Sequence, residues 1–546
     1  MRRHMKTMAI AGSVALLAAA CGGGGGGGEA GSTGGSGSGS SASASGGGAA
    51  GGSFSVARGE PTYLFPPGNC YESECSAILD TLWAGLVEIK DNKLQYRVAK
   101  SITSDDQIHW DIKLNKGYTF ANGEPVNAAA FMRAWNYTSY GPNAQQTSGF
   151  FTQVKGYDAL QGDKPKAKKL SGLKKVNDYE FKVTLDAPFS QFPYMLTYKP
   201  AFAAVSQKCL DNVKACNEGK MPIGDGPYQM DGQWAHNDHI KVKKNPGYPG
   251  EDAGKADEIT FKLYQKMDTA YRDWQAGNLD IVAPIPSQVD QAKQAAGDRQ
   301  LTATSSSFTY VGLPMYVDYL KNPKIRHALS LAIDRKALIK NLLAGLGKPA
   351  QSVVSPVVPG GGGDHCKYCE YDPKRAKQLA KEAGGLPNTI TIWVNTGAGN
   401  DEWVQAVGDM WKQTFGVNYK IKAMEWPEYL KTMGAHKATG PFRLGWLMDY
   451  PSMINYMKPI YFKNAPSNYM GYDNPKFEAL IKKGSAASSN DEAIKYYSKA
   501  EDMLIEDMPV IPILYGQEFV IWSQHVGNVN YNAVNGIDYT QVTVNQ

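Results

Sequence analysis

Residues 22–52 most strongly limit how this chain can fold, because they contain almost nothing except glycine, serine and alanine. Glu29 and Thr33 are the exceptions. Such a tract has too little apolar surface to offset the conformational entropy that folding removes, so we expect a flexible linker with an r.m.s. span of roughly 30 Å. Any folded body must therefore begin near residue 53, which leaves about 490 residues, enough for two or three lobes with separate cores.

The segment before this linker has the pattern of an export signal. Basic residues precede an apolar run at residues 8–20, which is too short to cross a bilayer core that needs about 20 residues. The run closes with the sequence AAAC at residues 18–21, which resembles a bacterial lipobox, although Ala18 stands where leucine is commoner. The resemblance implies that residues 1–20 are a signal peptide and that Cys21 carries a lipid as the new N-terminus. Ordinary secretion, with Cys21 as a free thiol, is the alternative.

The charge balance argues against a nucleic-acid partner. The chain has a formal net charge of +5, and Arg2, Arg3 and Lys6 belong to the signal, so the remainder carries about +2. The densest basic stretch, at residues 164–175, has the composition of a solvated loop. A nucleic-acid-binding domain would concentrate basic residues on one face, so we expect no such partner.

Apart from Cys21, six cysteines remain, and they fall into three close pairs. An even number in an exported chain favours disulfides, and closing short loops costs the least entropy. The sequence HCKYC at residues 365–369 also suggests a metal or redox site, but no second Cys/His pair has zinc spacing relative to it, so we expect no metal site. The predicted disulfides are Cys70–Cys75, Cys209–Cys216 and Cys366–Cys369.

Hydrophobic periodicity predicts an α/β chain. One well-marked helix has Asn322 as its N-cap and Pro323 in its first turn, and we expect it to continue until Gly345 or Gly347. A second helix begins at Asp372 and ends before a Gly-Gly pair. Strand-like alternation occurs at residues 180–185, 240–243, 258–264, 390–395 and 418–424.

The sequence carries no recognisable motif for catalysis. It has no Gly-x-Ser-x-Gly elbow, no phosphate-binding glycine-rich loop and no His-Glu-x-x-His zinc helix, and its eight histidines are scattered. Residues distant in sequence could still meet as a catalytic dyad. The sequence nevertheless favours a binding protein over an enzyme, with no catalytic residue and no cofactor.

Six short segments follow one another in a characteristic order. They are LDTLWAGL at 79–86, FANGEPVNA at 120–128, GDGPY at 224–228, NPGY at 245–248, IRHALSLAIDR at 325–335 and YDPKRA at 371–376. Each segment alone is a weak signal, but their common order is specific. Together they resemble the peptide- and nickel-binding family of solute receptors for bacterial ABC importers, family 5, over about residues 79–516.

A further segment, RLGWLMDY at residues 443–450, resembles a stretch of the oligopeptide-binding members of that family. The resemblance implies that Asp449 pairs with the α-ammonium group of a peptide and that Gly445 and Trp446 supply main-chain contacts. It also implies that Arg443 meets the carboxylate end of a short peptide. Without the resemblance, Asp449 would be expected to cap a turn, Trp446 to be a core residue and Arg443 to neutralise a structural carboxylate.

Glu425 and Trp426 resemble another ligand-side pair of that subgroup, with Trp426 as a pocket wall. The residue types suit a receptor for many peptides, because every peptide shares an amine, a carboxylate and a regular backbone. A carboxylate–ammonium contact contributes roughly 1.5–3 kcal/mol, and either charge left unpaired in a closed cleft would cost more. N-acetylated peptides should therefore be rejected.

The resemblance implies a two-lobed α/β fold of the periplasmic-binding-protein type II (cluster C) class, with an extra subdomain on the N-terminal lobe. The ligand cleft would lie between the lobes, and hinge closure would complete the ligand contacts. Residues 21–52 would form the lipid anchor and linker. The expected bounds are 53–96, 222–308 and 516–546 for lobe I, 97–221 for the extra subdomain and 309–515 for lobe II.

The implied function is capture of short peptides outside the membrane and their delivery to the permease and ATPase subunits of an ABC importer. We expect a monomer that is lipid-anchored to the cell membrane, with a Gram-positive outer leaflet favoured over a periplasmic face. The main alternative is the same receptor role for a non-peptide solute, such as an oligosaccharide or a metal chelate. A signalling or adhesion module with a degenerate cleft is a further alternative.

Overall fold

The computed structural model describes residues 51–90, 93–221, 223–396, 400–534 and 536–545. All the described residues belong to one compact unit, Gly46–Gln546. Cys21, the predicted signal peptide and nearly all of the linker lie outside them. Within the described ranges, no helix combines the length and the apolar character needed to cross a membrane.

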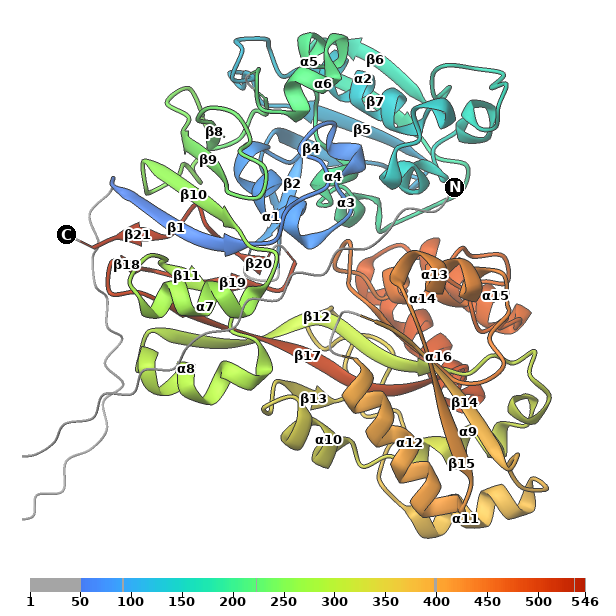
Figure 1. Ribbon diagram of the computed structural model, residues 1–546. Helices are drawn as coiled ribbons and strands as arrows, with labels where there is room; N and C mark the ends of the chain where they lie inside the picture. Colours follow the sequence, from blue (N-terminus) through green and yellow to red (C-terminus); the bar gives the residue numbers. More distant parts are fainter. Residues whose placement is uncertain (1–50, 91–92, 222, 397–399, 535, 546) are drawn as a thin grey trace, which may run out of the picture. The chain divides into compact units, whose positions relative to one another are not determined.

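The largest element is an 11-stranded mixed sheet (Figure 1). Its strands are β1 Ser53–Arg58, β8 Tyr228–Met230, β9 His239–Lys244, β10 Glu258–Leu263, β11 Ile281–Val282, β12 Gln300–Gly312, β13 Gly347–Pro349, β14 Thr389–Asn395, β15 Asn418–Met424, β16 Phe442–Trp446 and β17 Val510–Trp522. They follow the order β15-β14-β16-β12-β17-β11-β1-β10-β9-β8, and β13 pairs with β17 beside that path. One sheet therefore joins strands from the beginning, the middle and the end of the described chain.

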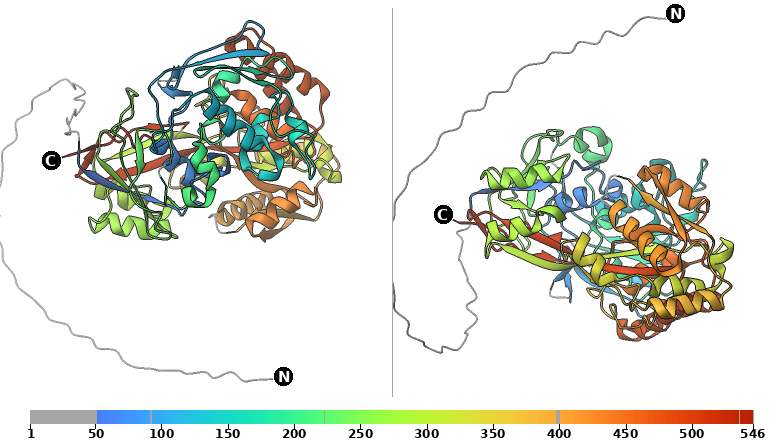
Figure 2. Two further views of the ribbon diagram at one scale, coloured as in Figure 1. Left: turned by 90° about the horizontal axis from the view of Figure 1, so that it is seen from above. Right: turned by 60° about the horizontal axis from the view of Figure 1, so that its bottom comes forward.

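Strands β12 and β17, each of 13 residues, run side by side in all three ribbon views (Figures 1 and 2). β17 also pairs with β11, and β12 also pairs with β16, so this pair connects the two halves of the sheet. The β12–β17 register shifts between Thr304 and Phe308, opposite Gly516. A Cβ on Gly516 would lie 2.0 Å from Ser307 Oγ, so glycine allows the close approach of the strands at this irregularity.

A separate four-stranded antiparallel sheet has the order β4-β5-β7-β6. Its strands are β4 Ala99–Thr103, β5 His109–Leu114, β6 Leu173–Asn177 and β7 Glu180–Thr184. Helix α2, at Ala128–Ser139, contributes the fully buried Trp135. The Trp135 ring lies 5.5 Å from the Phe181 ring and 5.3 Å from the Phe202 ring, centroid to centroid. This sheet and helix therefore share an aromatic core.

The long helix predicted after Asn322 is instead two helices, α9 at Pro323–Leu331 and α10 at Arg335–Leu342. The side chain of Asp334 accepts a hydrogen bond from the N–H of Ala337, 2.9 Å away. Asp334 therefore caps the start of a new helix, and the prediction of one continuous helix is wrong. The predicted cap at Asn322 is confirmed, because its side chain accepts from a backbone N–H in the first turn.

The second predicted helix is confirmed as α11, at Pro373–Glu382. The Asp372 side chain accepts from the N–H of Arg375, 2.9 Å away, and caps the start. Gly384 and Gly385 follow the helix with φ angles of 91° and 92°, which glycine adopts without a Cβ clash. The five predicted strand segments are also confirmed, within a residue or two at their ends, as β7, β9, β10, β14 and β15.

The remaining secondary structure is mostly helical. The helices are α1 Ser73–Leu82, α3 Phe192–Met195, α4 Lys199–Phe202, α5 Gln207–Asp211, α6 Val213–Asn217, α7 Met267–Gln275, α8 Val289–Ala296, α12 Asp401–Phe415, α13 Trp426–Gly434, α14 Met453–Tyr461, α15 Pro475–Ser485 and α16 Asn490–Asp507. Short strand pairs are β2 Val87–Lys90 with β3 Lys93–Tyr96, β18 Val526–Gly527 with β21 Thr543–Val544, and β19 Tyr531–Asn532 with β20 Gly536–Ile537.

The structure pairs the six described cysteines as three disulfides with short sequence separations. The Cα–Cα distances are 5.6 Å for Cys70–Cys75, 5.5 Å for Cys209–Cys216 and 5.3 Å for Cys366–Cys369. Each bond closes a small loop, so the disulfides restrain local segments and do not tie distant parts of the chain together.

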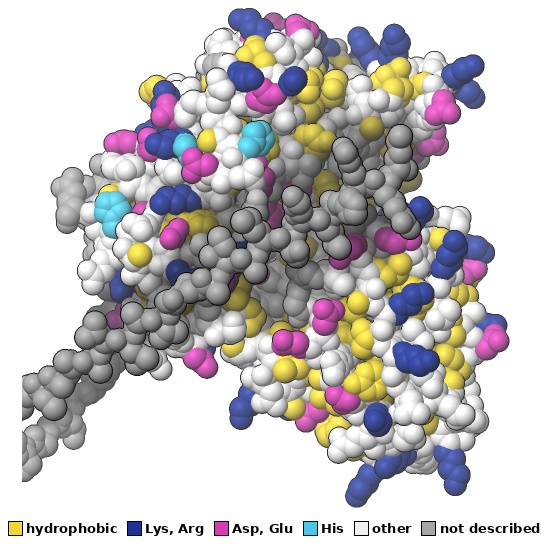
Figure 3. Space-filling view, in the orientation of Figure 1, with side chains coloured by type: hydrophobic (Ala, Val, Ile, Leu, Met, Phe, Trp, Pro, Cys, Tyr) yellow, Lys and Arg dark blue, Asp and Glu magenta, His cyan; other side chains and the backbone are white. Residues whose placement is uncertain are grey.

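Charged side chains are distributed over the visible surface of the molecule. On the face shown in Figure 3, Lys and Arg side chains lie at many separate places, with Asp and Glu side chains among them. Mixed charge of this kind keeps a protein soluble without creating a field of one sign.

Candidate functional site

The predicted ligand residues at 443–450 lie on β16 and in the loop that follows it. β16 pairs antiparallel with β12, where Gly445 faces Thr309 and Trp446 faces Phe308. A Cβ on Gly445 would lie 3.0 Å from the Phe308 carbonyl oxygen, so a small residue suits this close contact. Asp449 lies three residues beyond the strand, and the chain then enters α14. The site loop, residues 447–452, is thus held between a paired strand and a helix.

Asp449 is held by the side chain of Asn455. The Asp449 backbone N–H donates to Asn455 Oδ1, 2.9 Å away, and Asp449 Oδ2 accepts from Asn455 Nδ2, also 2.9 Å away. Burial raises the pKa of Asp449 to about 6, and the Asn455 hydrogen bond opposes that rise. No Lys, Arg or His side chain forms an ion pair with Asp449 in the described part of the chain. The site therefore offers a carboxylate, largely ionised at neutral pH, without a basic partner.

Aromatic side chains lie near this carboxylate. Burial, together with the nearby Asp449 charge, raises the pKa values of the Tyr198 and Tyr456 hydroxyls. The Phe150 ring stacks on Tyr198 at 4.6 Å and meets Tyr450 edge-on at 6.5 Å, centroid to centroid. Phe150 and Tyr198 belong to the predicted extra subdomain, so the surroundings of Asp449 combine distant parts of the sequence.

Trp446 shares its polar partner with Asp449. Its indole Nε1–H donates to Asn455 Oδ1 over 3.2 Å, and its side chain is partly exposed. One buried asparagine thus joins two of the predicted ligand residues. The sequence analysis missed Asn455, because no quoted motif includes it; the only available signal is its position six residues after Asp449, in the next helix.

Arg443 has no carboxylate partner among the described residues. Its Nη1 lies 3.4 Å from Asn395 Oδ1, and its buried Nε has no hydrogen-bond acceptor in the described ranges. Burial lowers the pKa of Arg443, while the hydroxyls of Tyr429 and Tyr310 oppose the shift. A cation in this setting retains hydrogen-bonding capacity for an anionic ligand group.

Glu425 and Trp426 lie at the start of α13. The Glu425 carboxylate accepts from Thr396 Oγ1, 2.6 Å away, and Trp426 is 42% exposed. The Trp426 ring stacks on Tyr429 at 6.1 Å, and the Tyr429 hydroxyl donates to the Arg443 carbonyl over 2.6 Å. Trp426 and Arg443 are thus linked through Tyr429, and the Glu425 carbonyl accepts from the backbone N–H of the same tyrosine, 2.9 Å away.

A cavity of about 800 Å³ adjoins the site loop and includes Pro451 in its wall. Among its described lining residues, only Lys90 and Asp538 are charged. The other lining side chains are aliphatic, prolyl, aromatic, hydroxyl or amide groups: Ile89, Tyr194, Ala303, Thr304, Pro356, Val357, Pro359, Pro451, Asn528, Asn530, Tyr531, Asn532, Ala533, Val534 and Gln541. A cavity of this size and mixed polarity can hold a small flexible ligand.

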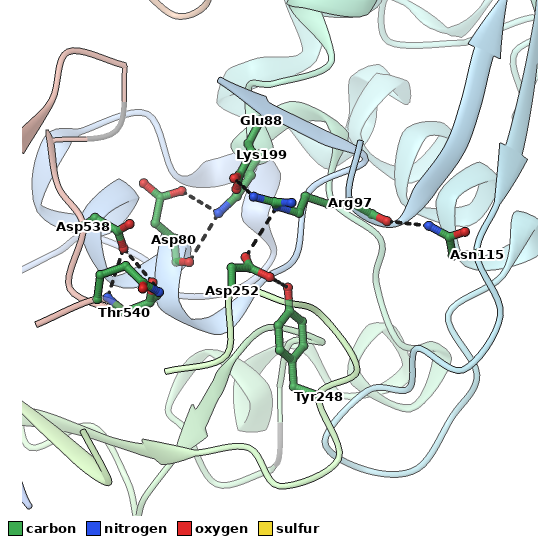
Figure 4. A network of polar contacts seen from close by, with 10 residues as sticks. Asp80, Glu88, Arg97, Asn115, Lys199, Tyr248, Asp252, Asp538 and Thr540 are labelled. Carbon is green, nitrogen blue, oxygen red and sulfur yellow. Dashed lines mark hydrogen bonds and ion pairs between the residues drawn. The ribbon is translucent and has the colours of Figure 1, made fainter. Parts of the chain in front are cut away.

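A second cavity of about 460 Å³ has a strongly charged lining and shares Ile89, Lys90, Asn532, Asp538 and Gln541 with the first. Lys199 Nζ lies 3.0 Å from Asp80 Oδ1, and Arg97 pairs with both Glu88 and Asp252 (Figure 4). The Tyr248 hydroxyl donates to Asp252 over 2.8 Å. These paired charges come from well-separated segments and hold them together beside the larger cavity.

No group of three or more His, Cys, Asp or Glu side chains is placed to hold a metal ion in the ranges that the structure describes. His365 instead contacts carboxylates: its Nδ1 lies 2.7 Å from Asp502 Oδ1, and its Nε2 lies 3.8 Å from Glu501 Oε2. The adjacent Cys366 and Cys369 are paired as a disulfide.

Comparison with known proteins gives concordant results for sequence and fold. The model of the family described as "Bacterial extracellular solute-binding proteins, family 5 Middle" matches residues 93–468. The oligopeptide-binding protein OppA of Bacillus subtilis is 27% identical over 469 residues, which cover 82% of this chain and 85% of OppA. The 2.2 Å crystal structure of the ABC transporter substrate-binding protein CtaP of Listeria monocytogenes superposes with a TM-score of 0.78 and 21% identity, covering 91% of this chain and 100% of that chain.

A second solved structure is a complex with a peptide. Haemophilus influenzae OppA in complex with RPPGFSPFR superposes with a TM-score of 0.74 and 22% identity, covering 90% of this chain and 99% of that chain. The chain therefore shares the fold of these binding proteins, and the predicted two-lobed α/β fold class is confirmed.

Proposed function

The chain belongs to the bacterial extracellular solute-binding proteins of family 5, and we propose that it captures short peptides and delivers them to an ABC importer. The observation that carries this proposal is the partly buried Asp449 carboxylate, which is fixed by Asn455 and lacks a basic partner among the described residues. The relative OppA is an oligopeptide-binding protein and the second solved structure is a complex with RPPGFSPFR, and both support the same cargo class.

The amine end of the peptide would pair with Asp449. An ammonium group placed against this carboxylate forms a charge-assisted hydrogen bond that contributes roughly 1.5–3 kcal/mol. The neighbouring rings of Phe150 and Tyr198 would exclude water and add cation–π attraction. Gly445 and Trp446 would supply contacts to the peptide beside its amine.

The carboxylate end of a short peptide would meet Arg443. The absence of a carboxylate partner for this guanidinium among the described residues supports that role. The stack of Trp426 on Tyr429 supports Trp426 as a wall near that end of the site. Glu425 would lie at the edge of the ligand site and contribute less to binding, because its carboxylate already accepts a hydrogen bond from Thr396. A longer peptide would pass Arg443 without placing its carboxylate there.

The body of the peptide would extend towards the cavity of about 800 Å³ next to Pro451. The amide side chains that line the cavity can bond the peptide backbone directly or through ordered water. The mostly neutral walls of the cavity tolerate varied peptide side chains. The same lining supports a second candidate cargo, an oligosaccharide. Tyr194 and Tyr531 can stack on sugar rings, and the four amide side chains can bond hydroxyls.

Ligand capture would proceed by closure of two lobes. We place lobe I at residues 53–96, 222–308 and 516–546, the extra subdomain at 97–221 and lobe II at 309–515. Contacts across these proposed boundaries support a closed state: Ser452 Oγ donates to Gln191 Oε1 over 3.0 Å, and the Ser190 N–H donates to the Ser485 carbonyl over 3.0 Å. A ligand that bridges the lobes would favour this state, which the importer would recognise.

The proposed receptor is a monomer on the outer side of the membrane, held there by a lipid on Cys21 and by the linker at residues 22–52. The Gly/Ser composition of the linker favours a Gram-positive outer leaflet over a periplasmic face. The role needs no chemical step and no cofactor, because the ATPase subunits of the importer would hydrolyse ATP.

The test is a thermal-shift panel on residues 53–546 with di- to hexapeptides, oligosaccharides and metal chelates. Stabilisation by peptides, and not by the other two classes, would support peptide capture, because a ligand that binds the folded state raises its melting temperature. Stabilisation by oligosaccharides or chelates, with no response to peptides at millimolar concentration, would leave the receptor role intact and reject the peptide assignment.

A further inference from the structure

Asn455 lies in the first turn of α14 and is 2% exposed. Its Oδ1 accepts two hydrogen bonds, from the Asp449 backbone N–H and from the Trp446 indole N–H. Its Nδ2 donates to the Asp449 carboxylate. Both donors to Oδ1 are fixed as donors, so the amide orientation is determined and the NH₂ group must face Asp449.

We propose that Asn455 is a positioning residue for ligand capture: it keeps the Asp449 carboxylate charged and holds it beside Trp446 for contact with a ligand amine. This inference rests on the proposed function. The inference goes beyond the proposed function because it assigns control of the charge and position of Asp449 to a residue that does not itself contact the ligand.

Only an amide at position 455 performs all three tasks. A serine is too short to bond the backbone N–H, the indole and the carboxylate together, and a leucine leaves two partly buried N–H groups without this acceptor. An aspartate would face the Asp449 carboxylate with a second negative charge. The geometry is therefore specific to asparagine at this place in α14.

The charge of the Asp449 carboxylate depends on the groups that face it. These are the hydroxyls of Tyr198, Tyr450 and Tyr456 and the amide of Asn455; no basic side chain pairs with the carboxylate within the described ranges. Burial raises the pKa of Asp449 to about 6, and Asn455 is the group that lowers it. Without the amide, the carboxyl should keep its proton at higher pH and lose its attraction for an ammonium group.

The decisive substitution is Asn455→Leu, which preserves side-chain size and removes every side-chain hydrogen bond of residue 455. Asn468→Leu is the matched control, because Asn468 is also a buried asparagine, 3% exposed, whose amide bonds only backbone groups of its own loop. Asn455→Ser serves as a second variant if the leucine protein does not fold. Each variant is compared with the wild type by calorimetric titration with a free tripeptide between pH 5 and pH 9.

Asn455→Leu should weaken binding of the tripeptide at pH 7 at least about tenfold and move the acid limit of binding upward by about one pH unit. Asn468→Leu should leave both quantities unchanged in the folded protein. In the Asp449→Asn background, adding Asn455→Leu should change affinity less than about twofold, because the residue acts through Asp449. Binding by Asn455→Leu within twofold of wild type, with an unchanged pH profile, would overturn the inference.

A second measurement separates this inference from the proposed function. Carbon-13 NMR of the Asp449 carboxyl in the ligand-free protein reports its titration whether or not peptides bind. A higher midpoint in Asn455→Leu or Asn455→Ser, combined with no peptide binding by the wild type, would reject the function and keep Asn455 as the group that controls Asp449. An unchanged midpoint would reject the role of Asn455 even if peptides bind.

Discussion

Replacing Asp225 by asparagine should stabilise the protein at neutral pH. Asp225 is 1% exposed and lies between Gly224 and Gly226, which pack closely against the backbone of Leu82. A Cβ on Gly224 would lie 1.9 Å from the Leu82 carbonyl oxygen, so the backbone segments are closely packed at this turn. The carboxyl accepts a hydrogen bond from the Ala84 N–H over 3.2 Å, and its Oδ2 has no hydrogen-bond partner among the described residues.

Burial raises the pKa of Asp225 from 3.8 to about 8, against the opposing bonds from backbone N–H groups and the charge of Lys199. The folded chain therefore keeps the proton at pH 7, whereas the unfolded chain releases it. Between about pH 4 and pH 8 the unfolded state binds fewer protons, so the free energy of unfolding falls as pH rises. At about 1.4 kcal/mol per pH unit, the cost approaches roughly 4 kcal/mol at pH 7 as an upper bound.

Asparagine has the same shape and does not titrate, so Asp225→Asn should recover about 2–4 kcal/mol at pH 7 and little at pH 4.5. Urea unfolding of both proteins at pH 4.5, 6, 7 and 8 measures the difference, and an unchanged m-value ensures that the comparison concerns stability alone. A variant that is less stable than wild type at pH 7, or a stability difference that does not change with pH, would refute the reasoning.

Three further predictions concern other parts of the molecule. Lys199→Met should lower the free energy of unfolding by about 3 kcal/mol in urea titrations, because Asp80 then lies unpaired in a mostly buried site, and adding Asp80→Asn should restore part of the loss. Gly516→Ala should cost about 1–3 kcal/mol in the same assay through its overlap with Ser307 Oγ, and Ser307→Ala should relieve that cost. Calorimetric titration at several pH values should show constant peptide affinity above about pH 7 and about tenfold weaker binding per unit well below pH 6, because binding needs the ionised Asp449.

The sequence was most informative where residues close together along the chain define the structure. The capping signals at Asn322 and Asp372 marked true helix starts, and ordered motifs identified the family and its fold class. The prediction of one continuous helix after Asn322 was wrong. The apolar spacing continues past Asp334, but the Asp334 side chain caps the start of a second helix. Hydrophobic periodicity indicates which face of a helix is buried, but it does not show where a capping side chain begins a new helix.

Contacts between distant segments were beyond the reach of sequence reasoning. The motif at residues 443–450 named Asp449 and Trp446 but gave no sign that one amide on α14 bonds both. Tyr198 lies near Asp449, with Phe150 stacked on it, only because the chain folds back on itself, and no local sequence pattern predicts that approach. The proposed lobe boundaries remain predictions for the same reason.

The most direct test of the account is one calorimetric comparison at pH 7.5: a free tripeptide and its N-acetylated counterpart, each titrated into the wild type and into Asp449→Asn. The account predicts that acetylation weakens binding to the wild type by at least about tenfold, and that the substitution weakens binding of the free peptide similarly while leaving little further effect of acetylation. Equal affinity of the wild type for the two peptides would contradict the assignment of Asp449 as the group that holds the amine.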